Sequence, residues 1–162
     1  MTVLVAYASK HGATAGIAEA IAHTLADHDV KAEARGVDEV NDLGPYEAVV
    51  LGSAVYAGSW MKDAVSFAER HAVALARMPV WLFSSGPLGE DVKDAEAQPR
   101  QLAEMRRTIA PRDHRVFFGA LDMSTLGFGE RMIVKAVKAP VGDFRNWDAI
   151  RGWAEGIAEE LD

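Results

Sequence analysis

The sequence predicts an α/β fold, a doubly wound sheet of five parallel strands with helices on both faces. Short apolar runs alternate with longer helical patterns along the chain, without internal repeats or low-complexity linkers. Strands separated by helices pair in parallel through right-handed crossovers, which place helices on both faces of the sheet. The chain has 162 residues, of which 49% are apolar, so we expect a single domain spanning residues 1–162.

The first half of the chain carries the patterns of three strands and two helices. Ile17, Ile21 and Leu25 recur every four residues, as on one face of a helix. Residues 48–52 are apolar throughout, as in a strand covered on both faces, whereas residues 31–37 alternate weakly and indicate an edge strand. The expected elements are strands at 3–7, 31–37 and 48–52, and helices at 14–26 and about 61–77, the latter with Val65, Ala68, Ala72 and Leu75 facing inward.

The second half adds two strands, two helices and an extra segment. Gly86 and Pro87 break the fourth strand, and Pro111 ends the helix that follows it. An extra segment at about 122–145, called the insert below, is longer than an ordinary connection and contains a helical pattern at 129–139. The other expected elements are strands at 79–85 and 115–121, and helices at 97–110 and 146–161, the last with Trp147, Ile150, Trp153, Ala154 and Ile157 facing inward.

The charge of the chain is unevenly distributed. Its 17 basic and 24 acidic residues give a net charge of -7, which argues against general nucleic-acid binding because that binding neutralises phosphates. Residues 1–99 carry 7 basic and 14 acidic residues, whereas residues 100–151 carry 10 basic and 6 acidic ones. In the insert, Arg131, Lys135 and Lys138 share one face of the helical pattern, and we call these three residues the basic stripe.

Several kinds of chemistry are excluded or disfavoured by composition. The absence of cysteine excludes disulfides, thiolate metal sites and cysteine nucleophiles. The five histidines are scattered without metal-ligand spacing, so we expect no metal. The amino-terminal stretch lacks a basic leader and a long apolar run, which predicts a cytoplasmic protein, with peripheral attachment at the inner face of the cell membrane left open.

In a parallel sheet, ligands bind at the carboxyl ends of the strands, so the loops after the first, third and fourth strands are the candidate site. The first loop, residues 9–14, is small and hydroxyl-rich and runs directly into a helix, as in an anion site, but an ordinary capped turn fits equally well. It lacks the glycine patterns of dinucleotide and nucleoside-triphosphate loops, so a single terminal phosphate fits it better.

The other two loops are expected to hold a planar ring. At 52–60, small residues allow close backbone approach while Tyr56 and Trp60 cover the ring, although both aromatics could instead pack on neighbouring loops. Residues 84–89 form another small, backbone-exposing loop. The candidate cofactor-binding residues are Ser9, Lys10, His11, Gly12, Ala13, Thr14, Ser53, Ala54, Val55, Tyr56, Ala57, Gly58, Trp60, Ser84, Ser85, Gly86 and Gly89.

These loops resemble those of the flavodoxin family, whose phosphate loop has the pattern [ST]-x-T-G-x-T. Ser9, Gly12 and Thr14 match that pattern, whereas His11 stands where the family has its middle threonine. The resemblance implies a sheet of strand order 2-1-3-4-5 and one bound FMN. Because His11 stands in place of the threonine, a hydroxyl that would contact the phosphate is missing. A flavodoxin-like module that has lost FMN is therefore a further alternative.

Over nearly its full length, the chain is most similar to the bacterial flavodoxin-type, menaquinone-dependent protoporphyrinogen oxidases of haem biosynthesis. Besides the phosphate loop, the resemblance rests on residues 50–52 with Gly58 and Trp60, on residues 119–121, on residues 131–135 of the insert and on residues 146–148. In that family FMN takes electrons from protoporphyrinogen IX and passes them to a quinone, and the insert is linked to activity. The insert here is shorter between Lys138 and Trp147.

Two function classes follow from the resemblance. One is an FMN-dependent oxidoreductase of the protoporphyrinogen and quinone type, in which the flavin carries the chemistry and no catalytic side chain is required. The alternative is an electron-transfer flavodoxin that docks a redox partner protein and has no small-molecule substrate of its own. The basic stripe would meet porphyrin propionates or anionic lipid in the first case, or it is simply a solvated helix face.

Overall fold

The computed structural model describes residues 1–9, 12–56, 58–86, 99–117, 120–121, 142–143 and 145–161. Five strands form a parallel sheet in the order β2-β1-β3-β5-β6, and the short β4 pairs antiparallel with the end of β3. The strands are β1 (Thr2–Ala8), β2 (Lys31–Gly36), β3 (Ala48–Tyr56), β4 (Ser59–Trp60), β5 (Val80–Ser85) and β6 (Asp113–Phe117). This arrangement confirms the predicted fold class, since β4 lies outside the five-strand order.

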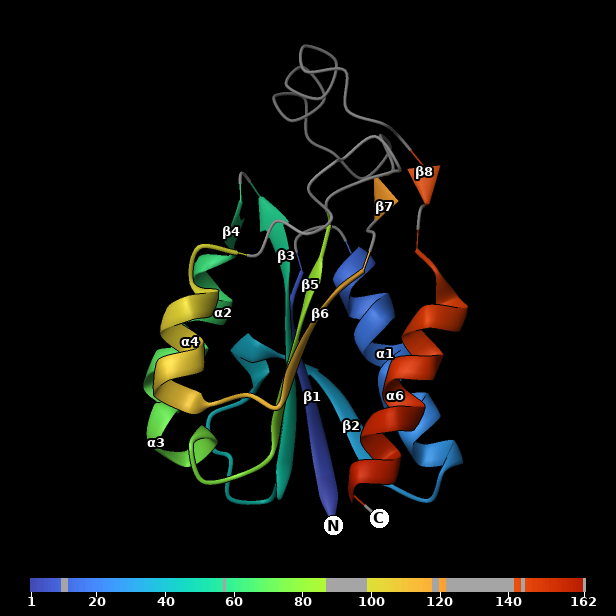
Figure 1. Ribbon diagram of the computed structural model, residues 1–162, viewed down its shortest axis with the longest axis horizontal. Helices are drawn as coiled ribbons and strands as arrows, with labels where there is room; N and C mark the ends of the chain where they lie inside the picture. The colour runs from blue at the N-terminus through green and yellow to red at the C-terminus, as the bar shows by residue number, and fades with distance from the viewer. Residues whose placement is uncertain are drawn as a thin grey trace.

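Helices cover both faces of the sheet (Figure 1). On one face lie α1 (Ala13–Asp27) and α6 (Trp147–Leu161), and on the other lie α2 (Lys62–Arg70), α3 (Ala72–Leu75) and α4 (Leu102–Ile109). A short 3-10 helix, η1 (Val37–Glu39), follows β2. A separate two-stranded ribbon pairs β7 (Ala120–Leu121) with β8 (Gly142–Asp143).

The alternation of side chains along the strands divides the core into two layers. Leu4, Leu51 and Leu82 face α2, α3 and α4, whereas Val5 and Trp81 face α1 and α6. Every residue of β5 is buried, as in a strand covered by helices on both faces. The central strands are thus packed on both faces, and the three candidate loops begin at their carboxyl ends.

Two helices differ from the sequence-based prediction. The helix expected at about 61–77 is interrupted at His71, which caps the end of α2 and the start of α3 with non-helical backbone angles. Of the residues predicted to face inward, Ala68 and Leu75 are buried, whereas Val65 and Ala72 are only half-buried. Ala64 and Phe67 are fully buried as well. The helix expected at 97–110 begins only at Leu102 within the described residues.

The third and fifth strands also differ from their predicted extents. β3 continues to Tyr56, beyond the predicted end at residue 52, because its last residues pair with β5 and then with β4. The predicted strand 115–121 is divided: β6 begins at Asp113 and ends at Phe117, while β7 pairs with β8. Among the described residues, no helix is both long and apolar enough to cross a membrane.

Candidate functional site

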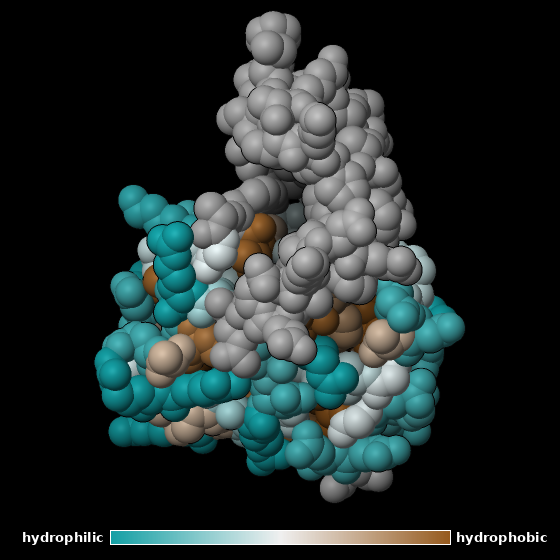
Figure 2. All heavy atoms as spheres, turned by 45° about the horizontal axis from the view of Figure 1, so that its top comes forward, coloured by the Kyte–Doolittle hydropathy of each residue, from teal (hydrophilic) through white to brown (hydrophobic). Residues whose placement is uncertain are grey.

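The ends of β1, β3 and β5 bring the three predicted loops to one edge of the sheet. Ala8 pairs with Ser53, and Ala54 pairs with Ser85, so the chain leaves the three strands at adjacent positions. This edge is at the top of Figure 1 and is turned toward the reader in Figure 2. On the coloured part of this face, Figure 2 shows hydrophobic residues at the surface among hydrophilic ones. The carboxyl edge is therefore the candidate cofactor site.

The first loop is shaped by an internal hydrogen bond and a left-handed glycine. Gly12 precedes α1 with φ 88°, and its N–H donates to the Ser9 hydroxyl at 3.0 Å. No side chain caps the helix, and the N–H groups of Ala13 and Thr14 lack partners within the helix, as at any helix start. Together with the helix dipole, these groups favour an anion at this position. Lys10 and His11 lie outside the described residues.

The second loop, expected at 52–60, contains a β-hairpin. Val55 pairs with Trp60 and Tyr56 with Ser59, and the turn between them contains Gly58 with φ 78°. A turn that returns a strand on itself this tightly requires positive φ, which glycine adopts without steric cost. Ala57 and the side chain of Tyr56 lie outside the described residues.

Trp60 is part of the protein core. It is 3% exposed, and it packs in the layer under α2 and α4. Its indole N–H donates to the Ser84 hydroxyl at 2.8 Å, and its backbone N–H donates to Oε1 of Gln101 at 3.2 Å. These surroundings correspond to the alternative in which the aromatic packs on neighbouring segments. Contact between Trp60 and a bound ring stays a prediction.

The start of α4 holds the hairpin, a contribution that the sequence did not reveal. Gln101 Nε2 donates to the Ser59 hydroxyl at 2.7 Å, and the backbone N–H of Arg100 donates to the Gly58 carbonyl at 3.0 Å. A glutamine before a helix carries no pattern that marks such a contact, because its partner lies 42 residues away. The second loop is thus positioned by the strand before it and by a distant helix.

The hydroxyls of Ser53 and Ser84 are used inside the protein. Both residues are 0% exposed. Ser53 donates to the Ala54 carbonyl at 2.8 Å and accepts from the Met61 N–H at 2.9 Å. These bonds orient the ends of β3 and β5, so the two serines act as positioning residues for the loops that follow them.

Ser84 also contacts Nε2 of His114 at 2.8 Å. An indole N–H can only donate, and Ser84 has no other acceptor among the described residues, so we assign the hydroxyl proton to the contact with His114. Nε2 of His114 is then an unprotonated acceptor. Burial, helped by the charge of Arg106 and opposed by that of Asp113, lowers the pKa of His114 to about 4, which agrees with a neutral ring.

The third loop again begins with a left-handed glycine. Gly86 has φ 104°, and its N–H donates to the Phe117 carbonyl at 2.8 Å. Ser85, just before it, is 5% exposed, and Gly89 lies outside the described residues. Among the described glycines, those with positive φ are Gly12, Gly58 and Gly86, one in each of the three loops. Such backbone-lined loops suit the close approach of a flat ring with a phosphate tail, as FMN requires.

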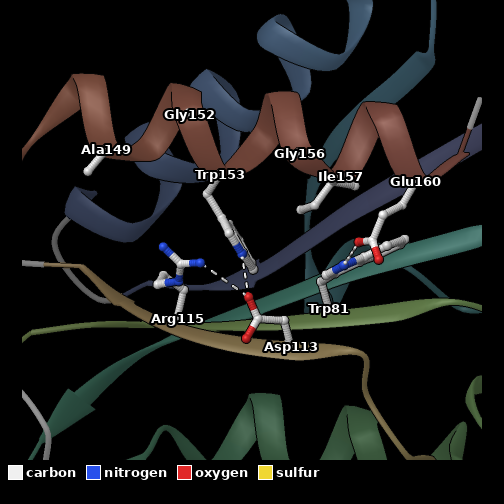
Figure 3. A pocket seen from close by; sticks show the side chains of 9 residues that line it. All are labelled: Trp81, Asp113, Arg115, Ala149, Gly152, Trp153, Gly156, Ile157 and Glu160. Carbon is white, nitrogen blue, oxygen red and sulfur yellow. Dashed lines mark hydrogen bonds and ion pairs between the residues drawn. The ribbon is translucent and has the colours of Figure 1, made fainter.

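A second concave region lies away from this edge, between α6 and the sheet (Figure 3). It has a volume of about 440 Å³, and its walls include Trp81, Asp113, Trp153 and the α6 glycines Gly152 and Gly156. None of its lining residues belongs to the three loops. This pocket is therefore separate from the predicted cofactor site.

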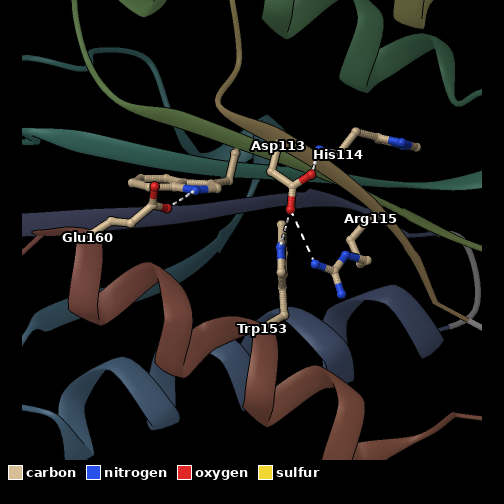
Figure 4. A network of polar contacts seen from close by, with 6 residues as sticks. Asp113, His114, Arg115, Trp153 and Glu160 are labelled. Atoms are coloured by element: carbon tan, nitrogen blue, oxygen red, sulfur yellow. Dashed lines mark hydrogen bonds and ion pairs between the residues drawn. The ribbon is translucent and has the colours of Figure 1, made fainter.

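Indole–carboxylate hydrogen bonds cross this pocket and fasten α6 to the sheet (Figure 4). Trp153 Nε1 donates to Oδ2 of Asp113 at 3.0 Å, and Arg115 lies 3.4 Å from the same oxygen. Trp81 Nε1 donates to Oε2 of Glu160 at 3.1 Å. Since these polar groups already satisfy one another, their arrangement explains how α6 is held.

Arg145 is a further residue at the cofactor edge that sequence reasoning missed. Its guanidinium Nη1 lies 3.4 Å from the Ala13 carbonyl, in the first turn of α1. One signal was present in the sequence: Gly16 lies inside a predicted helix, where glycine is unfavourable without a packing reason. Arg131, Lys135 and Lys138 of the basic stripe lie outside the described residues. No cluster of three metal-ligating side chains occurs among the residues with described positions.

Comparison with known proteins points to one family. The family profile described as a flavodoxin domain matches residues 4–147. The whole chain is 22% identical to protoporphyrinogen IX dehydrogenase (quinone) of Escherichia coli (strain K12) and covers 97% of it. A flavodoxin from the domain Archaea has a TM-score of 0.64 with 19% identity, over 99% of both chains. Oxidised flavodoxin 1 from Bacillus cereus has a TM-score of 0.64 with 11% identity, over 100% of both chains.

Proposed function

Because the chain belongs to the flavodoxin family, which implies FMN as its cofactor, we propose that it is an FMN-dependent oxidoreductase that oxidises a porphyrinogen and reduces a quinone. One observation carries the proposal: the similarity to a protoporphyrinogen IX dehydrogenase extends over 100% of this chain and 97% of that protein. A match of that extent spans the residue range of the insert, which the resemblance links to activity.

The residues of the chain bind and orient the cofactor, and bound FMN supplies the electron and hydride chemistry. The first turn of α1, with Gly12 and Thr14, receives the phosphate end. The backbone around Gly58 and Gly86 lines the ring edge, and their neighbours Ser53 and Ser84 keep both loops in place. No catalytic acid–base pair from the chain is part of this proposal.

We propose that the basic stripe binds the anionic groups of the substrate or of the membrane that contains the quinone. Arg131, Lys135 and Lys138 would attract porphyrin propionates or the anionic lipid headgroups around a membrane quinone. Three basic residues give only weak and salt-sensitive membrane attachment, at roughly 1 kcal/mol each near an anionic surface. The protein would then lie in the cytoplasm and attach reversibly to the inner face of the membrane.

A second candidate function is electron transfer between proteins, without a small-molecule substrate. Two observations favour it: the similar solved structures include flavodoxins, and residues 1–99 carry twice as many acidic as basic residues. An acidic surface suits docking to a basic redox partner. The basic stripe of the insert favours the enzyme instead, because its positive charges would attract porphyrin propionates and lipid phosphates.

Complementation separates the two candidates. The full chain is expressed in a bacterial strain that lacks protoporphyrinogen oxidase, and growth without added haem is scored. We expect growth with the parent chain, and we expect the purified holoprotein to oxidise protoporphyrinogen faster when a menaquinone analogue is present. A variant with Arg131, Lys135 and Lys138 changed to Ala tests the stripe, with the three single variants beside Arg151→Ala as the control for loss of one surface charge outside the insert. No growth and no quinone-dependent oxidation would favour the electron carrier.

A further inference from the structure

We propose that Arg145 sets the affinity of this chain for the phosphate end of FMN, and that Gly16 and Trp147 hold its guanidinium at the first turn of α1. The inference rests on FMN as the cofactor, and it is independent of the substrate proposed above. It concerns a residue outside the three loops, contributed by the segment just before α6.

Arg145 joins two elements that are far apart in the sequence. Its Nη1 lies 3.4 Å from the carbonyl oxygen of Ala13, a residue 132 positions earlier in the chain. Its guanidinium carbon lies 4.6 Å from the centre of the Trp147 ring, within the range of a cation–π contact. The guanidinium is therefore held between the start of α6 and the first turn of α1.

Gly16 makes this approach possible. A Cβ atom built on Gly16 would lie 2.6 Å from Nη1 of Arg145 and 3.8 Å from the Trp147 ring. The first distance is too short for real atoms, so any side chain at this position would displace the guanidinium. Gly16 donates its N–H to the Gly12 carbonyl within α1, and its φ is not positive, so helix geometry itself does not require glycine. The helix instead tolerates an unfavourable glycine where Arg145 packs against it.

The position of the charge indicates an anion as the target. The first turn of a helix carries partial positive charge, and the Arg145 guanidinium adds a full positive charge beside it. A phosphate group of charge near -2 is attracted by both the helix and the arginine. The phosphate distinguishes FMN from riboflavin. Arg145 should consequently affect binding of FMN and leave binding of riboflavin almost unchanged.

The test compares the two flavins on apoprotein prepared from the full chain. Dissociation constants are measured by quenching of flavin fluorescence, at several sodium chloride concentrations. We expect Arg145→Gln to weaken FMN binding about three- to tenfold, as removal of one partly screened charge does, while riboflavin binding changes less than about twofold. The salt dependence of FMN binding should become shallower. Arg145→Lys should retain part of the affinity, because it keeps the charge but loses the planar group over Trp147.

Gly16→Ala provides an independent route to the same result. Its methyl group displaces the guanidinium without removing it, so FMN binding should weaken, and the double variant with Arg145→Gln should be no weaker than Arg145→Gln alone. Gly156→Ala is the matched helix control, since nothing lies within 4 Å of its added Cβ. Arg151→Gln is the matched charge control, because Arg151 lies on α6 and pairs with Asp148.

Three results would overturn the inference. They are an FMN dissociation constant within twofold of the parent in Arg145→Gln, an equal loss of riboflavin binding, or the same loss in Arg151→Gln. None of them depends on porphyrinogen oxidation. Failure of the complementation test would leave these binding constants unaffected, so the two proposals fail separately.

Discussion

At the carboxyl edge, the same residue type can be needed for packing, for backbone conformation or for ligand binding. The small residues after the third strand predict room for a planar ring. At Gly52 that room is taken by the protein itself, because a Cβ there would lie 2.0 Å from Cζ of Phe83. At Gly12, Gly58 and Gly86 the reason is backbone conformation, since all three have positive φ. The sequence shows that a glycine is present but not which of these reasons applies.

The lowered pKa of His114 predicts how the free energy of unfolding depends on pH. Its pKa in the folded protein is about 4, below the unfolded value of 6.5, so the native state binds fewer protons in this interval. The contribution of the neutral ring is complete above pH 6.5 and is lost as the pH falls toward 4. Because the ring is only partly buried, we expect a loss on the order of 1–2 kcal/mol, after allowance for solvent screening.

Urea unfolding of the parent and of His114→Gln at pH 7.5, 5.5 and 4.5 measures this loss. Glutamine keeps an acceptor for Ser84 but does not titrate, so the variant should lose less stability on acidification. His23→Gln is the control, because the His23 side chain is 80% exposed. Equal pH profiles for the parent and His114→Gln would contradict the prediction.

At the scale of elements, hydrogen bonds between segments far apart in the sequence determine how the helices are held against the sheet. The start of α4 fixes the hairpin of β3 and β4, and the indoles of Trp81 and Trp153 fix α6 over the sheet. Apolar periodicity predicted the inward face of α6, and Ile150, Trp153, Ala154 and Ile157 are buried as predicted, whereas Trp147 is half-buried. It could not predict Asp113 as a partner of Trp153, because hydropathy does not encode hydrogen-bond pairing across 40 residues.

Trp153→Phe tests the hydrogen bond between Trp153 of α6 and Asp113 of β6. The phenyl ring keeps contact with Phe83 and Phe117 but loses the indole N–H that donates to Asp113. We expect the free energy of unfolding to fall by about 1–3 kcal/mol, measured by urea denaturation, from the lost hydrogen bond and reduced volume. Asp113→Asn keeps an acceptor and should cost less. A change below about 0.5 kcal/mol in Trp153→Phe would show that the bond does not stabilise α6.

At the scale of the whole molecule, we propose that the three loops at the carboxyl edge of the packed sheet form one cofactor site. Titration of apoprotein with FMN should therefore show one flavin per chain, with a visible absorption band. Thermal unfolding should shift upward, since FMN at a hundredfold excess over its dissociation constant stabilises the native state by about 2.7 kcal/mol. Riboflavin at the same concentration should give a smaller shift. A protein that stays colourless on titration would contradict the cofactor assignment.

The pattern of the sequence by itself determined the five parallel strands, the helices on both faces and the edge where the loops meet, because periodicity and crossover handedness depend on local pattern. The order of the strands was implied only by the resemblance to the flavodoxin family. The sequence also determined the uneven charge, which separates the acidic first 99 residues from the more basic segment after them. Only the tertiary structure decided that Trp60 and Ser84 are bonded inside the core and that Arg145 reaches the first turn of α1. Those contacts join residues 24 and 132 positions apart, and their geometry exists only once the sheet and its helices have packed.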